Sequence, residues 1–447
     1  MRSFPTSVSR PMLEKLDRFI NNEQRSDISD YTPDHVLRVL DRFGNPHRTL
    51  TTIHVAGTNG KGSVAHMIQA IFNCAGYAAG LYTSPHLLEV NERISIGSRH
   101  IPEAVLEQYA DDIIGNDWPS HAPRATYFDI LTVIAFRYFA DSHVDVAIIE
   151  TGLGGRLDST NVISPLCSVI TDISMDHAHV LGPTVEAIAA EKAGIIKKDT
   201  PVITSNTVPS IASILQERAD SMHAPLYRIG RDFKAEHVTE QGSGFRYDYL
   251  PVTIPLPSVP GIVIHHPLDR QVANSALAVT AVLSMTGAFP LLAAESVRTG
   301  LANLKIPGRF EILSEHPAIL FDPAHNVAAF SEMIKLVGKK YPDRDITLVL
   351  SLMKDKDIEG ILSVPAGRPG LSLVYYILDD DRCFRPSGTP FAPMFTSIIE
   401  NDESALRRQL DGMASGRSLF FFTGSFRLYR TALGYAAGYA RRQGAGE

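Results

Sequence analysis

The sequence predicts an α/β protein whose first domain is built on a mostly parallel sheet with a phosphate-binding loop and is followed by a smaller α/β domain. Short apolar β-like runs alternate with helical patterns along most of the chain, the pattern of a parallel sheet covered by helices on both faces. A glycine-rich turn joins the first such run to a helix. The chain has 447 residues, more than one ordinary core accommodates, so two domains are expected.

The glycine-rich turn at residues 57–63 is the most informative stretch. Residues 51–55 before it are β-branched and partly apolar, and apolar residues recur every three or four positions over 64–75, which predicts a strand and an amphipathic helix. Glycines let backbone N–H groups approach an anion, and Lys61 adds a mobile cation. The spacing departs from the common Walker pattern, and Ser63 stands one position late for magnesium. The alternative is a glycine-rich turn without a ligand.

Composition narrows the class of protein. The formal net charge is -7, from 42 basic and 49 acidic residues, which argues against nucleic-acid binding through a general basic surface. Cys74, Cys167 and Cys383 lie far apart, so neither a disulfide framework nor a zinc cluster is indicated. Cys74 and Cys167 have apolar neighbours and are expected in the core. The sequence has neither a signal-peptide pattern nor a run of about 18 apolar residues, so we expect a cytoplasmic protein without membrane contact.

The first domain is expected to span residues 1–304. It contains predicted strands at 144–149, 168–171 and 201–204, and predicted helices near 126–142, 184–196, 208–220, 271–285 and 291–304. Between 222 and 265 short β-like pieces are broken by Gly and Pro, which predicts a small antiparallel insertion.

A break at Lys305–Arg309 starts the second domain, which is expected to span 305–447 and to be Rossmann-like. Its predicted strands lie at 318–322, 346–351, 372–378 and 418–423, with helices between them.

Two residues follow predicted strands, where a parallel sheet binds ligands, and a lysine lies on the inward face of a predicted helix. Glu150 ends an apolar strand, and because ligands bind outside the carboxyl ends of such strands it is well placed to hold magnesium; the alternative is a solvated loop glutamate. His177 follows the next strand and, taken alone, is favoured as an ordinary loop histidine over a ligand. Lys192 shares the inward face of its helix with Val185 and Ile188. It either reaches solvent or lies near a metal site, modified to carry negative charge.

A series of short motifs runs along nearly the whole chain. They are GTNGKGS at 57–63, TSPHL at 83–87, NERI at 91–94, ETGLGGRLDSTN at 150–161, DHxxxLG at 176–182, EKAGI at 191–195, Gln271 with Asn274, PGRFE at 307–311, DPAHN at 322–326, KDKD at 354–357 and TGS at 423–425. In this order and spacing, the chain resembles folylpolyglutamate synthase and dihydrofolate synthase of the Mur ligase superfamily. The resemblance implies a Mur ligase-like fold and an ATP-dependent ligase that activates a pterin-linked carboxylate as an acyl phosphate, which the amine of L-glutamate then displaces.

The resemblance also implies roles for individual residues. The ATP-binding set is Gly57, Thr58, Asn59, Gly60, Lys61, Gly62, Ser63, Asn274, Arg309 and Asp322. The magnesium ligands are Ser84, Glu150, His177 and Lys192, and the pterin pocket is lined by Thr126, Tyr127, Phe128 and Asp129. Lys61, Lys192 and His325, which lies near the reacting phosphate, form the catalytic set. Lys192 matches a lysine carried as a carbamate, which forms only from the neutral amine, so partial burial would help.

The implied partners are ATP, L-glutamate, and dihydropteroate or reduced folates, with magnesium expected as two ions and a monovalent cation as a further candidate cofactor. A monomer is expected. Asp129 stands where the family usually has Glu, and Pro323 where Gly is frequent; the first change alters the expected pterin contact. Two other functions stay open: a Mur-type ligase for a non-folate carboxylate such as a cell-wall precursor, and a nucleotide-binding regulator without catalysis. The complete set of candidate catalytic and metal residues argues against the regulator.

Overall fold

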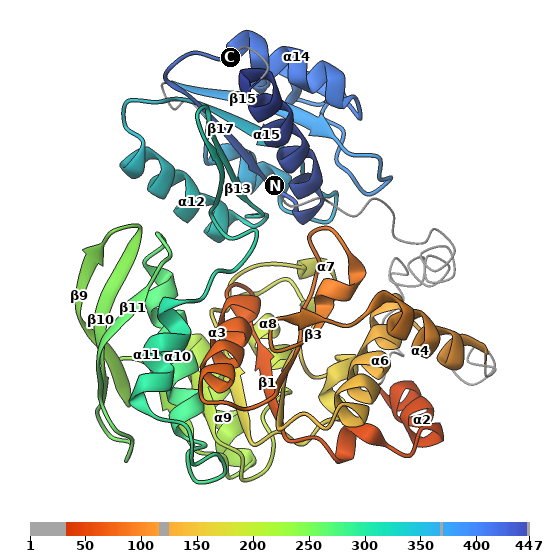
Figure 1. Ribbon diagram of the computed structural model, residues 1–447, viewed down its shortest axis with the longest axis vertical. Helices are drawn as coiled ribbons and strands as arrows, with labels where there is room; N and C mark the ends of the chain where they lie inside the picture. Colours follow the sequence, from red (N-terminus) through yellow and green to blue (C-terminus); the bar gives the residue numbers. More distant parts are fainter. Residues whose placement is uncertain (1–32, 116–124, 367–369, 445–447) are drawn as a thin grey trace. The chain divides into compact units, whose positions relative to one another are not determined.

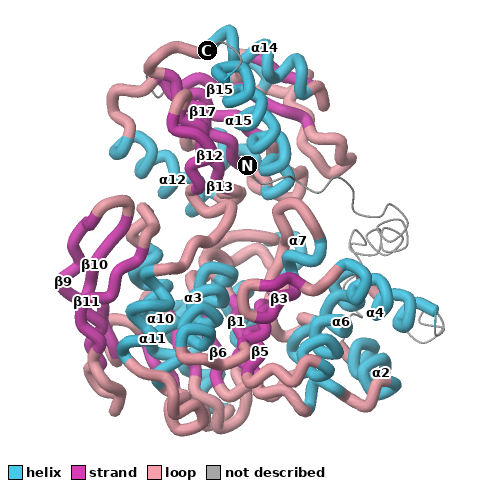
Figure 2. Tube along the Cα trace, viewed as in Figure 1, coloured by secondary structure: helices cyan, strands magenta, loops and turns pink. Residues whose placement is uncertain are grey.

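The computed structural model describes residues 33–115, 125–366 and 370–444. Their contacts group into two compact units. The first covers most of the chain up to Leu304, and the second covers the chain from Lys305 together with two short segments, Met175–His179 and His266–Leu268. Figures 1 and 2 show the elements of each unit. Within the described residues, none of the helices combines the length and the apolar character that crossing a bilayer requires.

The first unit is built on an eight-stranded sheet with the order β4-β3-β2-β5-β1-β6-β7-β8. The strands from β2 to β8 in this order run parallel, and β3 and β4 continue the sheet in antiparallel pairing beside β2. The fold class is the α/β class that the sequence predicts. The strands are β1 (Thr52–Ala56), β2 (Ala79–Tyr82), β3 (Ile94–Ile96), β4 (Arg99–His100), β5 (Val146–Glu150), β6 (Cys167–Ile170), β7 (Val202–Thr204) and β8 (Leu226–Arg228).

Helices bury both faces of this sheet. In β5, Val146 and Ile148 belong to one hydrophobic core, while the alternate residues Ala147 and Ile149 belong to another, as the two-residue period of a strand requires. The helices are α2 (Asp34–Arg42), α3 (Lys61–Cys74), α4 (Glu103–Gly115), α6 (Tyr127–Asp141), α7 (Ala178–Leu181), α8 (Val185–Ala193), α9 (Pro209–Ser221), α10 (Arg270–Leu283) and α11 (Ala294–Ala302). The first two residues of α7 belong to the Met175–His179 segment of the second unit. Short 3-10 turns are η1 (Pro46–Arg48), η2 (Val90–Arg93) and η3 (Ser159–Val162).

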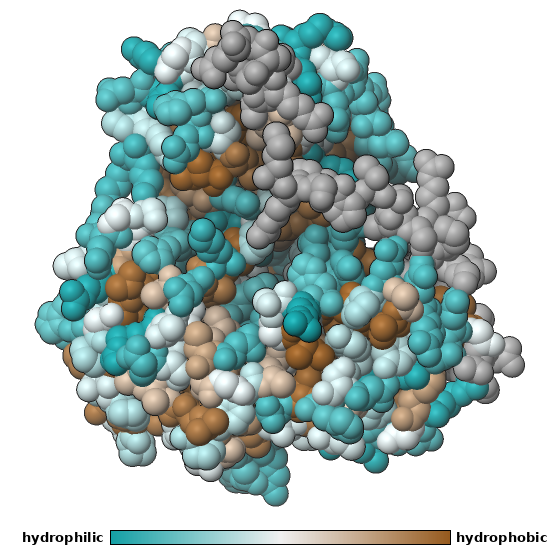
Figure 3. Space-filling model, in the orientation of Figure 1, coloured by the Kyte–Doolittle hydropathy of each residue, from teal (hydrophilic) through white to brown (hydrophobic). Residues whose placement is uncertain are grey.

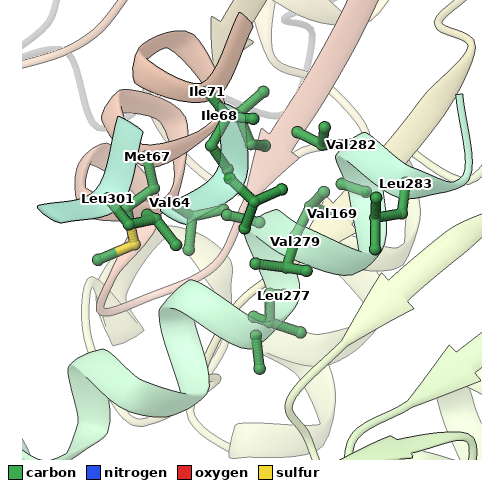
Figure 4. Close-up of a cluster of buried hydrophobic side chains, with 14 of the residues drawn as sticks. Val64, Met67, Ile68, Ile71, Val169, Leu277, Val279, Val282, Leu283 and Leu301 are labelled. Atoms are coloured by element: carbon green, nitrogen blue, oxygen red, sulfur yellow. The ribbon is translucent and has the colours of Figure 1, made fainter. Parts of the chain in front are cut away.

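The core on one face of the sheet is formed by α3, α10 and α11 (Figure 4). Residues at three- and four-residue spacing on α3, including Val64, Ile68 and Ile71, meet Val279 of α10 and Val169 of β6. This contact fixes α3 against the sheet, so the start of α3 is held rigidly at the end of β1.

A three-stranded antiparallel sheet packs beside α10 and α11. Its strands are β9 (Phe233–Gln241), β10 (Gly244–Pro251) and β11 (Val259–Ile264). Tyr247 and Tyr249 of β10 are fully buried, and their hydroxyls bond to Ser275 and Thr280 of α10. Residues 226–228 lie in the stretch expected to form the insertion, but β8 pairs in parallel with β7 in the main sheet.

The second unit contains a six-stranded sheet with the order β12-β13-β17-β14-β15-β16, parallel except for β12. Its core is a separate hydrophobic cluster. The strands are β12 (Glu311–Glu315), β13 (Ala318–Asp322), β14 (Asp345–Leu350), β15 (Leu371–Ile377), β16 (Ser397–Glu400) and β17 (Ser418–Thr423). The helices are α12 (Val327–Lys340), α13 (Ile358–Ser363), α14 (Glu403–Met413) and α15 (Tyr429–Gly444), with 3-10 turns η4 (Ala392–Met394) and η5 (Phe426–Leu428).

Surface apolar residues are scattered. On the face drawn in Figure 3, brown hydrophobic residues are interspersed with teal and white ones.

One core prediction was wrong. Cys74 is exposed, because it is the last residue of α3 and lies off the face that packs on the sheet, whereas Cys167 in β6 is buried as expected. The large hydrophobic residues exposed in the described chain include Leu166, Met175, Val208, Val238, Val252, Leu291 and Ile312.

Candidate active site

The parallel strands of the first unit bring their carboxyl ends to one edge. Val55 of β1 is in register with Glu150 of β5, and Ala56 with Ile170 of β6. The phosphate loop, Glu150 and the segment after β6 therefore start from neighbouring positions on the sheet. This is the edge at which open parallel sheets bind ligands.

The loop between β1 and α3 requires glycine at two positions. Gly57 has φ +151° and Gly60 has φ +93°, conformations that side chains disfavour. A Cβ on Gly57 would overlap the Thr171 side chain, and one on Gly60 would lie 2.8 Å from the Asn274 amide oxygen. The loop is also tied to the chain after β6, because Thr58 N–H donates to the Asp172 carbonyl at 2.7 Å. The backbone of the loop is thus fixed before any ligand binds.

Two lysine amines meet at the start of this loop. The Lys61 amine donates to the Gly57 carbonyl at 3.1 Å, and the Lys192 amine donates to the same oxygen at 2.7 Å. Lys192 is buried, with 4% of its surface exposed, as the helical periodicity predicts for the inward face of α8. The Lys61 cation beside the N–H groups of the α3 N-terminus makes this loop favourable for a polyphosphate.

Helix α10 supports the other side of the loop. Gln271 donates to the Ser63 hydroxyl at 3.3 Å, and Asn274 donates to Gln271 at 3.0 Å. Ser63 is 2% exposed, and its hydroxyl is held by α10. The motif contained Gln271, but without this contact the sequence assigned it no role.

Glu150 lies at the end of β5 with 3% of its surface exposed, and its carboxylate accepts from the Ser84 N–H at 3.1 Å. Carboxylate and hydroxyl oxygens are donors that magnesium prefers, so these two residues fit that ion. The Lys192 amine fits only after conversion to a carbamate, because a protonated amine has no lone pair to offer. No group of three or more His, Cys, Asp or Glu side chains in the described residues has a metal-holding arrangement.

Asp129, expected at the pterin, is fully buried. Its carboxylate accepts from the Thr126 N–H at 2.7 Å and from the Ser159 hydroxyl, and it lies 2.9 Å from His35 Nε2. Thr126 in turn accepts from the Asp129 N–H, which completes a capping box at the start of α6. The carboxylate therefore holds three parts of the chain together, and His35 is a partner that the sequence did not point to.

Of the two aromatic residues in the same segment, Tyr127 is buried and Phe128 is partly buried. Phe128 stacks on Tyr82 with ring centres 5.6 Å apart, and the guanidinium of Arg93 lies 5.2 Å from the centre of the Tyr127 ring. Gly152, in the loop after Glu150, lies so close to Phe128 that a Cβ would come within 2.6 Å of the ring. Phe128 is thus fixed from two sides.

A charged cluster forms in the second unit around Asp176. The Lys356 amine lies 2.8 Å from one Asp176 oxygen and His325 Nε2 lies 3.5 Å from the other. Burial alone would raise the pKa of the Asp176 carboxyl, but the hydrogen bond from His325 and the neighbouring cations hold that pKa well below its usual range. Burial and the Lys356 charge lower the pKa of His177 to about 4, so its imidazole is neutral near neutral pH. Neutral imidazole is the form that binds metals.

Two of the other predicted residues of the second unit, Arg309 and His325, lie beside Phe426. The guanidinium of Arg309 lies 4.8 Å from the centre of the Phe426 ring, and the His325 ring centre lies 5.9 Å from it. Asp322 accepts from the Phe310 and Ala324 N–H groups, each at 3.0 Å. Its carboxylate therefore fixes the backbone next to Arg309 and His325.

Comparison with known proteins agrees with this arrangement. Residues 55–282 match the Mur ligase middle domain. The dihydrofolate synthase/folylpolyglutamate synthase of Bacillus subtilis is 34% identical over 331 residues, which cover 73% of this chain and 76% of that protein. The chain belongs to the folylpolyglutamate synthase and dihydrofolate synthase family. Members of this family are ATP-dependent ligases, and the chain is an enzyme of that class.

Solved structures of the family share the fold. Mycobacterium tuberculosis folylpolyglutamate synthase, complexed with ADP and AMPPCP, has a TM-score of 0.80 and 29% identity, covering 96% of this chain and 98% of its own. A folylpolyglutamate synthase complex with AMPPCP and folate has a TM-score of 0.74 and 30% identity, covering 93% of this chain and 97% of its own. The family resemblance drawn from the motifs is therefore confirmed.

Within this folylpolyglutamate synthase fold, the predicted residues fall into local groups. In the first unit the loop residues 57–63 lie with Asn274 and Lys192, Ser84 lies with Glu150, and residues 126–129 form a third group. In the second unit His177, grouped there with the Met175–His179 segment, lies with Lys356, and Asp176 links Lys356 to His325. The KDKD motif carried Lys356, but nothing in the sequence indicated that it contacts residue 176.

Proposed function

We propose that this ligase joins L-glutamate to the carboxylate of dihydropteroate, of a reduced folate, or of both. The observation that carries the proposal is the meeting of Lys61 and Lys192 on the Gly57 carbonyl, next to the strand that ends in Glu150. The printed names of the relatives, and the ADP, AMPPCP and folate complexes among the solved structures, support it. ATP is the proposed energy source, and residues 57–63 with Asn274 are its proposed contacts in the first unit.

In the first proposed step, a carboxylate oxygen of the pteroyl substrate attacks the γ-phosphorus of ATP. The bond from that phosphorus to the bridging oxygen breaks, ADP leaves, and an acyl phosphate forms. Because both reactants are anions, the barrier is largely electrostatic, and Lys61 with the α3 N-terminus lowers it. In the first unit, Ser84 and Glu150 would hold magnesium, which would supply further positive charge to the phosphates.

In the second step, the amine of L-glutamate attacks the acyl carbon. The bond from that carbon to the phosphate oxygen breaks, phosphate leaves, and the attacking nitrogen loses a proton. In the second unit we assign His325 to the reacting phosphate, and Arg309 and Asp322 to the nucleotide. The Pro323 carbonyl can only accept, so the His325 Nδ1 that it contacts at 2.8 Å carries a hydrogen, and this contact fixes the ring.

Phe128 is the proposed platform for the pterin ring, because its position is fixed by Tyr82 and Gly152. Asp129 is assigned a supporting role, since its carboxylate is already used by Thr126 and Ser159. This role replaces the direct contact between Asp129 and the pterin that the resemblance implies.

We further propose that the Lys192 amine reacts with carbon dioxide to form a carbamate, with release of one proton. Conversion of the amine gives an anionic oxygen donor suited to magnesium. A monomer working in the cytoplasm is the proposed state.

The test is phosphate release from ATP in the presence of magnesium and L-glutamate, with dihydropteroate and tetrahydrofolate compared as acceptors. Mass spectrometry of each product follows the addition of one glutamate residue. We expect ATP turnover that depends on an acceptor and on L-glutamate. Turnover with neither acceptor, together with turnover of a nucleotide-linked peptide acid, would replace this proposal by a Mur-type ligase of another carboxylate.

A further inference from the structure

His54 is a buried polar residue that the proposed chemistry does not use. It is the third residue of β1, lies between β5 and β6, and precedes Gly57 of the phosphate loop by three positions. Its side chain is fully buried, and burial lowers the pKa of its imidazole to about 3. The ring is therefore neutral, with one nitrogen as donor and the other as acceptor.

A hydrogen-bond chain leads from His54 to the loop after Glu150. His54 Nε2 lies 2.8 Å from the Thr160 hydroxyl, which in turn donates to Asp158 Oδ1. The Asp158 carboxylate also accepts from the Thr160 N–H at 3.0 Å and from the Leu153 N–H at 2.8 Å. Asp158 thus ties the beginning of its own loop to η3.

The direction of this chain fixes the tautomer of His54. Asp158 accepts from backbone N–H groups at both of its oxygens, so the Thr160 hydroxyl donates its hydrogen to Asp158. Its oxygen then accepts from His54, and Nε2 carries the hydrogen. Nδ1 of His54 is buried and has no hydrogen-bond partner among the described residues.

The far end of the chain reaches the proposed pterin platform. Asp158 accepts from the Leu153 N–H, and the preceding residue, Gly152, lies so close to Phe128 that a Cβ there would come within 2.6 Å of the ring. The next hydroxyl along η3, that of Ser159, bonds to Asp129 of α6. Two consecutive hydroxyls therefore anchor η3, that of Thr160 to the strand that leads into the phosphate loop and that of Ser159 to the helix that carries Phe128.

We propose that His54 is a positioning residue for the pteroyl pocket. As the Nε2–H tautomer it holds Thr160 and, through Asp158, keeps Gly152 against Phe128. Strand β1, which leads into the phosphate loop, thereby also sets the shape of the proposed pteroyl pocket. This inference rests on the proposed function, because it assigns the pteroyl substrate to Phe128.

Kinetics of matched variants test the proposal. The side-chain amide nitrogen of glutamine can occupy the position of Nε2, whereas that of asparagine is nearer to Nδ1. We expect His54→Asn and Thr160→Val to raise KM for the pteroyl acceptor by about tenfold, the loss of one buried hydrogen bond, with a smaller change in kcat. His54→Gln and Thr160→Ser should stay within about threefold of wild type. ADP affinity should be unchanged in all four, because the loop from Gly57 is untouched.

Thr52→Val is the matched control. Thr52 lies two positions before His54, on the same face of β1, is buried, and has a hydroxyl without a partner in the described chain. The control should leave KM and kcat unchanged. Equal acceptor KM values in His54→Asn, Thr160→Val and Thr52→Val would overturn the proposal, as would a loss in His54→Gln as large as in His54→Asn.

A second measurement does not depend on activity. Nuclear magnetic resonance of the full-length protein with ¹⁵N-labelled histidine should show His54 with a protonated Nε2 and an unprotonated Nδ1, unchanged between about pH 5 and pH 8, the range in which ordinary histidines titrate. The opposite tautomer, or titration in that range, would contradict the hydrogen-bond chain. If wild type used no pteroyl acceptor, the proposed function would fail while the tautomer result still decided the structural part.

Discussion

Replacement of Gly57 by alanine perturbs the phosphate loop in a way that the structure allows to be worked out. The new Cβ would overlap the Thr171 hydroxyl and lie 3.0 Å from the Thr171 Cβ. It would also place a side chain at φ +151°. Overpacking of a tight site costs about 1–3 kcal/mol, and a disfavoured backbone conformation costs a further 1–3 kcal/mol, roughly. The total is about 2–6 kcal/mol.

Relief of this strain moves the Gly57 carbonyl away from Lys61 and Lys192. We therefore expect Gly57→Ala to lower ADP affinity by at least about thirtyfold, which corresponds to about 2 kcal/mol. Isothermal titration calorimetry measures the affinity, and urea unfolding measures the stability. Adding Thr171→Ala should recover part of the loss, giving a favourable coupling energy in the double-mutant cycle.

Gly338 supplies the control for this prediction. It lies in α12 with open space around the Cβ position, so Gly338→Ala should stabilise the protein by about 0.5–1 kcal/mol and leave ADP affinity unchanged. Wild-type ADP affinity in Gly57→Ala would refute the argument, because it would mean that the loop accepts a side chain at the point where both lysines bind it.

The other predictions concern single side chains. The pKa of His54 is about 3 in the fold and about 6.5 when unfolded, so its stabilising effect as a neutral residue is complete above about pH 6.5 and is lost as the pH falls toward 3. The free energy of unfolding of wild type should therefore fall more steeply than that of His54→Gln across this range, by about 1.4 kcal/mol per pH unit, in urea titrations. Asp129→Ala should lower the free energy of unfolding by about 3 kcal/mol, because Thr126 and Ser159 lose their shared acceptor and His35 loses the carboxylate beside it; a change below about 0.5 kcal/mol in chemical unfolding would contradict this network. Lys61→Ala should lower kcat by about a hundredfold or more in the phosphate-release assay, and near-normal turnover would remove Lys61 from the phosphate site. Lys192→Ala should lose most activity, with partial recovery on adding a short carboxylic acid but not bicarbonate; full activity without additions would show that no carbamate is needed.

Local periodicity accounts for the parts of the fold that the sequence predicted well. The apolar run that forms β5 is buried on both faces, and the three- and four-residue spacing in α3 matches its packing against α10. The same reasoning placed Lys192 on the inward face of α8, where it is buried. Such patterns follow from the geometry of one element, so they are readable without knowing the partners.

Contacts between distant segments were beyond that reasoning. The burial of Asp129 depends on His35 and Ser159, which belong to other elements and have ordinary sequence neighbourhoods. The Met175–His179 segment groups with the second unit, where Asp176 pairs with Lys356. In each case the motif identified a residue of interest, whereas its chemical environment was set by a partner that no spacing rule connects to it.

Oxygen transfer tests the central claim most directly. An acceptor whose carboxylate is labelled with ¹⁸O, either dihydropteroate or tetrahydrofolate, is converted with ATP and L-glutamate, and the released phosphate is analysed by mass spectrometry. An acyl phosphate formed by carboxylate attack, followed by cleavage of the bond between the acyl carbon and oxygen, predicts that each phosphate carries one oxygen from the acceptor. Glutamylated product accompanied by unlabelled phosphate would contradict the account.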